Sequence, residues 1–379
     1  MAVGDGARGA EIVRPHVLTD PLASITEVAR LAGVSIATAS RVLSSADYAV
    51  SAPTRQRVLE AATRLDYVPN ALARGLHKRQ VPVVGVNVHD ITDPYFSEVV
   101  RGVEDRAGDA GYLVIICSSD RDPEREVSYV RLLRSMRAGA VIFASSGFDD
   151  PAFNAALDNH LAGMRAYGAA VVHLSPHARR EPEVSVDNAG GIAAMVEALV
   201  ALGHREIAFL AGPTSLSVAR QRLEGYRDGL AAAGRPFDER LVEHGGLSQV
   251  GGAVGVDRLR ARGASFTALC CANDLLAIGA LRRFEELGIH VPRQVSVAGF
   301  DDIEMAAMTA PSLSTVRLPL RELGRRGFDY ADHVLSGEQP EHEVMPTSLV
   351  MRESTAPPPA ATMTAQLPTH TANARGVPA

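Results

Sequence analysis

The sequence has 379 residues, of which 46% are hydrophobic, so it can form more than one domain and fill a packed core in each. Its formal net charge of −6 excludes a protein that is covered with basic residues. The three cysteines, two of them adjacent at Cys270 and Cys271, exclude a disulfide framework and suit a reducing compartment.

The chain opens with residues 1–23, which are rich in Gly, Ala and Pro and show no clear period, so we expect a disordered leader. These residues lack the continuous apolar core of a secretory signal, and no later run of about 20 apolar residues occurs. We therefore expect a cytoplasmic protein without a membrane partner. Residues 356–379 are similar in composition and are predicted to form a disordered tail. This tail has no leucine heptads, so we expect no coiled coil there.

The segment from Ser24 to Gln80 differs in charge from the rest of the chain. It holds eight basic and four acidic side chains, a net charge of +4, which leaves −10 for the remainder. A basic head on an acidic body is typical of a protein that binds nucleic acid.

Residues 24–68 are predicted to form three short helices. Ser24 and Glu27 have the spacing of a capping box, in which the two side chains satisfy free amides at a helix start. Gly33 ends this helix at a position that favours left-handed backbone, and Ser35 caps the second helix. A third helix follows. A three-helix bundle without a DNA role would show the same pattern, so these signals alone leave the function open.

Residues 81–355 are predicted to form an α/β body. Apolar runs rich in Val, Ile and Ala alternate with amphipathic helices, which is typical of parallel strands buried on both faces. Two sets of such runs predict two doubly wound lobes that join near Gly203. The predicted strands are 81–88, 112–119, 139–146 and 168–175 in the first set, and 205–212, 266–274 and 295–302 in the second. The predicted N-lobe holds residues 81–202 and 317–336, and the C-lobe residues 203–316 and 337–355.

The head carries a long and specific motif, ITEVARLAGVSIATASRVLS followed by VSAPTRQRVLEAATRLDYVPNALARGL. It closely resembles the DNA-binding head of the lactose/galactose-repressor (LacI/GalR) family. The resemblance implies a helix-turn-helix whose second helix lies in the major groove. It places Ile36, Ala37 and Arg41 at base-reading positions. Arg41 can hold guanine through two hydrogen bonds, whereas Ile36 and Ala37 offer only apolar contact, for example to a thymine methyl group.

Other positions of the head match residues that contact the DNA backbone in this family, and such contacts fix the register without carrying sequence information. They are Thr38, Ser40, Thr54, Tyr67 and Asn70. Ser35 and Ala73 are also expected to lie against DNA.

Residues 69–80 resemble the family's hinge, which implies a helix that forms on the operator and enters the minor groove. Leu76 matches the leucine that wedges a central base step. Gly75 replaces a more usual serine, and glycine costs about 0.5–1 kcal/mol relative to alanine inside a helix. A simple linker is the alternative for this segment.

The resemblance continues through the body in DITDPYFSEVVRGVE (90–104), VDNAGG (186–191), LGHREIAFLAGP (202–213), CANDLLAIGALR (271–282) and VAGFDDIEMA (297–306). Such bodies resemble periplasmic sugar-binding proteins, whose two lobes close on a ligand by hinge motion. The implied fold is an N-terminal all-α head plus an α/β two-lobed periplasmic-binding-protein-like body with two doubly wound parallel sheets.

The family's effector-contacting positions are occupied here by residues suited to binding a small molecule. Arg222 offers a rigid fork of donors, and Asn273 and Asp301 can hydrogen-bond hydroxyl groups or ring nitrogens. Leu247 stands where many relatives have an aromatic residue, and Val218 replaces a common Ser or Thr, so both make the pocket more apolar. The remaining matched positions are Tyr95, Phe96, Ser146 and Asp187. Each of these residues could instead be a cap, a turn former or a packed aromatic.

We therefore expect a homodimeric repressor that binds a pseudo-palindromic operator and is controlled by a sugar-like effector or related metabolite. The resemblance implies dimer contacts around Val99–Arg106, Ala277–Leu281 and Ile303–Ser312. A solute-binding protein or sensor without a DNA role is the alternative. We expect neither an enzyme, a cofactor nor a metal site, because the sequence has no GxGxxG after the first strand, no P-loop, no HExxH and no nucleophile elbow.

Overall fold

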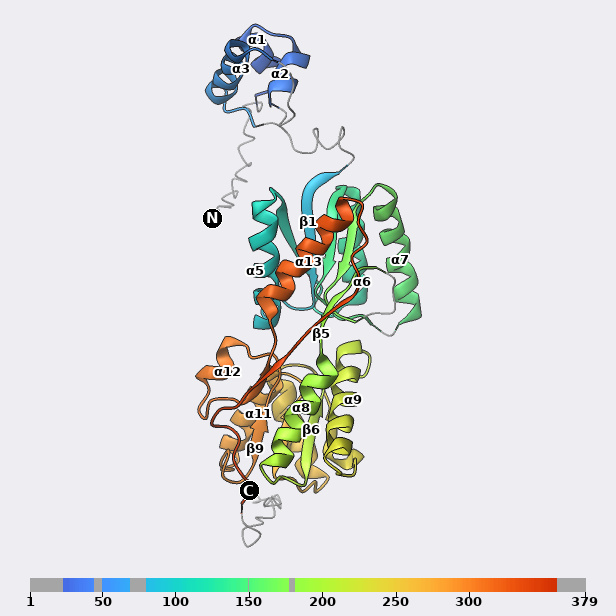
Figure 1. The fold of residues 1–379 in the computed structure, drawn as a ribbon, viewed down its shortest axis with the longest axis vertical. Helices are drawn as coiled ribbons and strands as arrows, with labels where there is room; N and C mark the ends of the chain where they lie inside the picture. Colours follow the sequence, from blue (N-terminus) through green and yellow to red (C-terminus); the bar gives the residue numbers. More distant parts are fainter. Residues whose placement is uncertain (1–22, 44–49, 69–79, 149, 177–180, 360–379) are drawn as a thin grey trace, which may run out of the picture. The chain divides into compact units, whose positions relative to one another are not determined.

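A computed structural model of the chain describes residues 23–43, 50–68, 80–148, 150–176 and 181–359. The chain divides into two compact units, Met1–His77 and Lys78–Ala379, whose elements are labelled in Figure 1. Within the described residues, no helix combines the length and the apolar character that crossing a bilayer requires.

The first unit is a three-helix head with α1 (Ile25–Ala32), α2 (Ile36–Leu43) and α3 (Ala52–Arg64). The predicted capping box is present, because the Ser24 hydroxyl accepts the Glu27 amide and the Glu27 carboxylate accepts the Ser24 amide. Gly33 ends α1 with φ 63°, as its position predicts. The helices pack around a core of small and β-branched residues, which are Val28, Ala29, Ala32, Ala39, Val42, Val58, Ala61 and Ala62.

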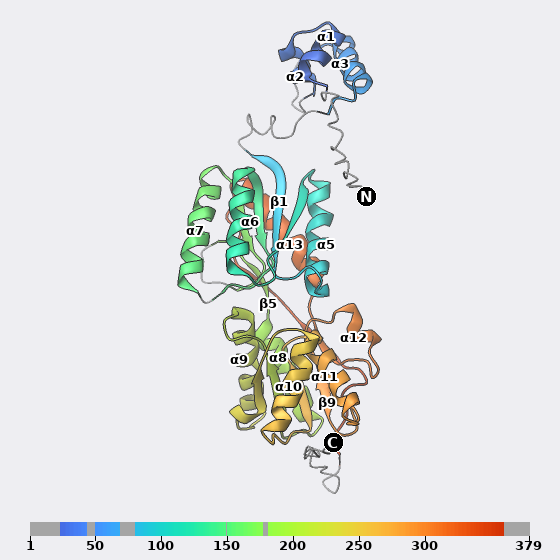
Figure 2. The same ribbon diagram turned by 180° about the vertical axis from the view of Figure 1, so that it is seen from behind.

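The second unit begins with an N-lobe built on a parallel sheet of order β2-β1-β3-β4. The strands are β1 (Val81–Val88), β2 (Leu113–Ser118), β3 (Ala138–Phe143) and β4 (Ala170–His173). Helices α5 (Pro94–Asp109) and α13 (Leu320–Leu335) pack on one face, and α6 (Pro123–Ser135) and α7 (Pro151–Ala166) on the other. Figure 2 shows the same layers from behind.

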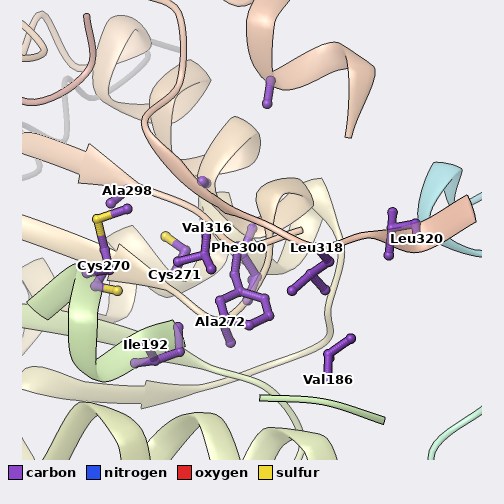
Figure 3. Close-up of a cluster of buried hydrophobic side chains, with 14 of the residues drawn as sticks. Val186, Ile192, Cys270, Cys271, Ala272, Ala298, Phe300, Val316, Leu318 and Leu320 are labelled. Atoms are coloured by element: carbon purple, nitrogen blue, oxygen red, sulfur yellow. The ribbon is translucent and has the colours of Figure 1, made fainter. Parts of the chain in front are cut away.

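The C-lobe repeats this plan with a parallel sheet of order β7-β6-β8-β9. Its strands are β6 (Ile207–Ala211), β7 (Val242–His244), β8 (Ala268–Cys271) and β9 (Ser296–Ala298). Its helices are α8 (Asn188–Ala201), α9 (Ser217–Ala232), α10 (Gln249–Ala261), α11 (Asp274–Glu286) and α12 (Glu304–Met308), with the short 3-10 helix η1 (Glu239–Leu241). Figure 3 shows part of its core, where Phe300 lies among side chains that include Ala272 and Val316.

Three segments connect the two lobes. The first leaves β5 (Val184–Val186) for α8, the second leaves β10 (Thr315–Arg317) for α13, and the third leaves β11 (Glu343–Met345) for β12 (Ser348–Val350). Strand β11 pairs with β5 in parallel, and β10 pairs with β12 in antiparallel. The connecting strands are therefore bound to one another in pairs.

The expected lobe boundaries differ from these connections in two places. The first join was predicted near Gly203, but α8 packs along α9 of the C-lobe, so the chain crosses at Asp187. The C-lobe was predicted to resume at residue 337, but β11 pairs with β5, so it resumes after Met345. The apolar pattern of α8 would suit a helix of either lobe, and only its packing against α9 assigns it to the C-lobe.

One strand departs from the expectation that every strand is buried on both faces. Strand β2 lies at the edge of its sheet, where Leu113 is 63% exposed and Ile116 is 41% exposed. An edge strand has a neighbour on one side only, so one row of its backbone groups is unpaired in the sheet. Two side chains of β2 are exposed as well, unlike those of β4 at the opposite edge, which are buried.

Candidate functional site

The second helix of the head presents the predicted base-reading residues outward. Ile36, Ala37 and Arg41 are exposed on α2, whereas Ala39 and Val42 are buried against the other helices. Ile36 is 50% exposed, which is unusual for a large apolar side chain and leaves it available to an apolar contact.

Polar residues surround this exposed face at the start of the helix. The Ser35 hydroxyl accepts the backbone amide of Thr38 at 3.1 Å and lies 2.9 Å from the Thr38 hydroxyl. Ser40 is exposed beside them. Serine and threonine hydroxyls in such positions can donate to phosphate oxygens.

Thr54, another of the residues predicted to contact phosphate, lies in the first turn of α3. The Ser51 hydroxyl donates to the Thr54 hydroxyl oxygen at 2.9 Å, which leaves the Thr54 proton for an outside acceptor. Tyr67 follows α3 and packs, half-buried, against the head's core. Asn70, Ala73 and Leu76 lie outside the described residues.

In the body, Arg222 on α9 lies at the centre of a buried polar cluster. Its Nε donates to the Asn188 side-chain oxygen at 2.9 Å and its Nη1 to the Ala272 carbonyl at 2.6 Å. Its Nη2 lies 3.4 Å from the Asp301 carboxylate, and both side chains are more than nine-tenths buried. The fold thus brings Arg222 and Asp301, which are far apart in the sequence, together in a buried ion pair.

Asp301 follows β9 and carries a buried carboxylate. Burial raises the pKa of Asp301 well above its usual value, and the positive charge of Arg222 opposes that shift. Removing the positive charge would therefore favour the neutral acid.

The N-lobe contributes Tyr95 and Phe96 from the first turns of α5, with ring centroids 5.0 Å apart. Burial raises the pKa of the Tyr95 hydroxyl, and the negative charge of Asp301 raises it further. Asp93 caps α5 through the Tyr95 amide, and its pKa is raised by burial while Arg222 lowers it. Side chains of both lobes therefore act on one another electrostatically at this place, which we name the interlobe site.

His89 is a residue of the N-lobe wall that sequence reasoning missed. Its Nε2 lies 3.2 Å from the Ser146 hydroxyl, and its ring makes edge contacts with Phe96 and Phe148. It is 3% exposed, and its Nδ1 has no hydrogen-bond partner among the residues that the structure describes. Burial lowers the pKa of His89 to about 3, so the ring is neutral near pH 7. The signal available in the sequence was a polar residue directly after a buried strand, Val81–Val88.

Direct contacts join the two lobes near Ser146. The Ser217 hydroxyl donates to the Pro176 carbonyl at 2.7 Å, and the Ser217 amide donates to the Gly147 carbonyl at 3.5 Å. Phe148 and Leu216 form an isolated β-bridge beside them. Residues from α9 of the C-lobe are thereby bound to the strand-end loops of the N-lobe.

Other predicted effector residues have structural roles. Asn273 caps α11 by accepting the Leu276 amide at 3.0 Å, and Asp187 caps α8 by accepting the Gly190 amide at 2.8 Å. Asp274, the residue after Asn273, is buried and accepts the Thr315 hydroxyl at 2.6 Å.

The remaining two predicted residues are the apolar departures from the family pattern. Val218 lies half-buried in the first turn of α9, and Leu247 packs half-buried against the core of the C-lobe.

A separate cavity of about 250 Å³ lies beside α10 and is lined in part by Gly245, Gly246 and Val250.

Comparison with known proteins places these sites in a family. Residues 24–70 match the model described as bacterial regulatory proteins, lacI family, and residues 196–355 match a periplasmic binding protein-like domain. The regulator DegA of Bacillus subtilis is 33% identical over 88% of this chain and 98% of its own length.

Solved structures give the same result. The Lac repressor dimer bound to operator and the anti-inducer ONPF superimposes with a TM-score of 0.77 at 29% identity, over 89% of this chain and 100% of that one. The regulator CelR in complex with cellobiose matches with a TM-score of 0.65 at 30% identity, over 88% of this chain and 99% of that one. The chain belongs to the lacI family of bacterial regulatory proteins and is a DNA-binding transcriptional regulator.

Proposed function

We propose that this regulator is a repressor that binds a pseudo-palindromic operator as a homodimer. The observation that carries the proposal is the outward face of α2, where Ile36, Ala37 and Arg41 are exposed around a helix whose inner side is buried. The Lac repressor, which this chain resembles, is described as a dimer bound to operator. A protein of this kind acts where the DNA is, in the cytoplasm.

Base recognition would depend mainly on Arg41, because its guanidinium can donate two hydrogen bonds to one guanine. Ile36 and Ala37 would add apolar contact with thymine methyl groups. Backbone contacts would come from Ser35 and from Thr38, Ser40, Thr54, Tyr67 and Asn70. Ala73 and Leu76 would lie in the minor groove.

The body would bind a sugar-like effector or related metabolite at the interlobe site. Arg222 and Asp301 supply donors and acceptors, and Tyr95 and Phe96 supply an aromatic wall in the opposite lobe. Asn273, Ser146 and Asp187 would add polar contacts, and Val218 and Leu247 apolar ones. CelR, a related regulator, is described as a complex with cellobiose.

Effector binding would bias the equilibrium between two body geometries, only one of which spaces the two heads for the operator. Coupling of this kind is typically about 1–3 kcal/mol and must be reciprocal between effector and DNA. Val99–Arg106, Ala277–Leu281 and Ile303–Ser312 would contribute to the dimer interface. Exposed apolar residues support an interface on the body, because Met308 is 69% exposed, Val250 74% and Leu113 63%.

The test is a titration of operator DNA from the region upstream of the gene, by fluorescence anisotropy, at salt concentrations from 50 to 200 mM. We expect a palindromic site, a steep fall of affinity with salt, and a sedimentation coefficient of a dimer. The titration is repeated with a panel of neutral sugars and other metabolites. A monomer that ignores these duplexes at every salt concentration, with or without metabolites, would contradict the proposal.

A further inference from the structure

Two consecutive aspartates after β9 have an unusual backbone. Asp301 has φ 119° and Asp302 has φ 57°, and both lie in the region that side chains other than glycine rarely adopt. Such conformations persist only where the surroundings hold them in place. The two carboxylates then serve different partners.

Asp302 binds two arginines that belong to the connecting strands. Its Oδ2 accepts Arg317 Nε at 2.6 Å, and its Oδ1 accepts Arg352 Nη2 at 2.7 Å. Arg317 ends β10, where the chain leaves for α13 of the N-lobe. Arg352 follows β12, where the chain has returned from the N-lobe, and it also donates to the Leu313 carbonyl at 2.8 Å. The side chain of Asp302 is 7% exposed, and the side chain of Arg352 is largely buried as well, so water has little access to the hydrogen bond between these two residues.

Asp301, one residue earlier, binds Arg222 and is attached to the same strand through its backbone. Its amide donates to the Val316 carbonyl at 2.9 Å, and its carbonyl accepts the Leu318 amide at 3.3 Å. Asp274 supports the turn from the other side by accepting the Ile303 amide at 2.9 Å. The position of the Asp301 carboxylate is therefore fixed relative to β10.

We propose that Asp302 is a positioning residue that locks the two connecting strands to the turn carrying Asp301. The closed arrangement of the lobes, by which we mean the one in which Ser217 of α9 is bonded to the N-lobe loops, and the Arg222–Asp301 pair are thereby maintained together. When the lobes open, the segments that lead from β10 to α13 and from β11 to β12 must change direction relative to the C-lobe, and the two hydrogen bonds of Asp302 resist that change by holding the ends of β10 and β12 in place. A molecule that competes for Asp301 acts on the same turn and is thereby coupled to lobe opening. The last step rests on the proposed function of the interlobe site, whereas the lock itself does not.

The closed arrangement has a reporter in the backbone, because the Ser217 amide on α9 donates to the Gly147 carbonyl of the N-lobe. This amide lies on a different element from Asp302 and its two arginines. Hydrogen exchange of a peptide spanning 214–219 therefore measures lobe opening, and peptides spanning 299–303, 313–318 and 349–353 measure local loosening of the turn and strands.

The experiment is hydrogen exchange with mass spectrometry on the full-length chain, without DNA or added ligand, for wild type, Asp302→Asn and Arg317→Gln. We expect both variants to exchange the 214–219 peptide at least about tenfold faster, the change expected from losing a charge-assisted hydrogen bond. Peptide 83–88 of the N-lobe core should be unchanged. Arg317 is 57% exposed, so its substitution tests the lock even if Asp302→Asn fails to fold.

Glu243→Gln is the matched control, because Glu243 is also a poorly exposed carboxylate held by two arginines, Arg258 and Arg262, in the same lobe. It lies on β7, away from the connecting strands, and should leave the 214–219 peptide at the wild-type rate. Faster exchange confined to 299–303, 313–318 and 349–353 in both Asp302→Asn and Arg317→Gln would overturn the proposal. Since neither DNA nor effector is present, this result is independent of whether the operator or the effector is found.

Discussion

The guanidinium of Arg222 lies over the ring of Phe300, with its Cζ 4.1 Å from the ring centroid. The same side chain also makes the only ion pair of Asp301 among the described residues. Arg222, which is 5% exposed, is thus held by one aromatic face, two hydrogen bonds and one carboxylate. Arg222 can be substituted only at a cost, because the buried carboxylate stays behind.

We therefore expect Arg222→Met to lower the free energy of unfolding by roughly 3–5 kcal/mol, the loss typical of a buried pair deprived of one partner. Urea unfolding at pH 7.5 measures this change in the free energy of unfolding. Arg240→Met is the control, because Arg240 pairs with Asp238 while its own side chain is 84% exposed, and no measurable change is expected. Equal stabilities of the two variants would contradict a structural role for the buried pair.

In the head, Arg41→Ala should weaken binding to the cognate operator by roughly 5- to 150-fold and relax the preference for guanine at one position of each half-site. Fluorescence anisotropy with the operator and with single-base variants checks this. Arg30→Ala on α1 is the control, because Arg30 is exposed on a helix that carries none of the predicted base-reading residues, so its substitution should change the affinity for all sequences alike. The same loss of affinity on every variant duplex for Arg41→Ala would show that Arg41 does not read a base.

Two glycines of α5 provide a paired test of helix packing in the N-lobe. A Cβ on Gly102 would lie 2.0 Å from the Arg321 carbonyl oxygen of α13, whereas a Cβ on Gly108 meets nothing within 4 Å. We expect Gly102→Ala to cost about 1–3 kcal/mol of unfolding free energy through the forced separation of the helices. Gly108→Ala should be neutral or stabilising by up to about 1 kcal/mol. Urea unfolding measures the free energy of unfolding of both variants. A Gly102→Ala protein as stable as wild type would mean that α5 and α13 are less tightly packed than described.

His89 gives the body an acid sensitivity with a definite sign. Its pKa is about 3 in the folded chain because of burial and the Arg121 charge, against 6.5 as the ordinary value. Between these pH values the unfolded chain binds a proton that the folded chain does not, so stability falls as the pH decreases below about 6.5. At pH 5.5 the loss attributable to His89 is about 1.4 kcal/mol.

Between pH 7.5 and pH 5.5, the free energy of unfolding of the variant His89→Gln should fall less than that of wild type. The difference should equal the loss attributed to His89. All other titratable groups are common to the two proteins, so the difference isolates His89. Parallel pH profiles in urea unfolding would refute the assignment of a low pKa to this ring.

The sequence predicted the helices of the head and seven strands of the body, because capping residues and continuous apolar segments are local signals. It did not predict β7 or the short strands β5, β10, β11 and β12, which have only three residues each. It did not predict where α8 belongs, since an apolar helix can pack in either lobe and only the partner α9 decides. It also left β2 among the buried strands, although edge position depends on sheet order, which periodicity does not record.

The interlobe site was predictable in part. Arg222, Asp301, Tyr95 and Phe96 could be named from the family pattern, and the structure shows their mutual influence. His89 could not be named from the family pattern. Its role depends on contacts with Ser146 and Phe148, which lie in a loop more than 50 residues later in the chain. The observed contacts of Asn273 and Asp274 could not be predicted for a similar reason, because whether a polar side chain caps a helix or accepts a hydrogen bond from a distant strand depends on its neighbours in the fold.

The three connections between the lobes have a consequence for dissecting this protein. Each lobe is assembled from separate stretches of the chain, so a gene fragment ending at any one crossing would encode an incomplete sheet or an uncovered helix face. A single cut by a protease in one crossing would, by contrast, leave two strands still holding the halves. Nicked material should therefore run as one species until a denaturant separates the pieces.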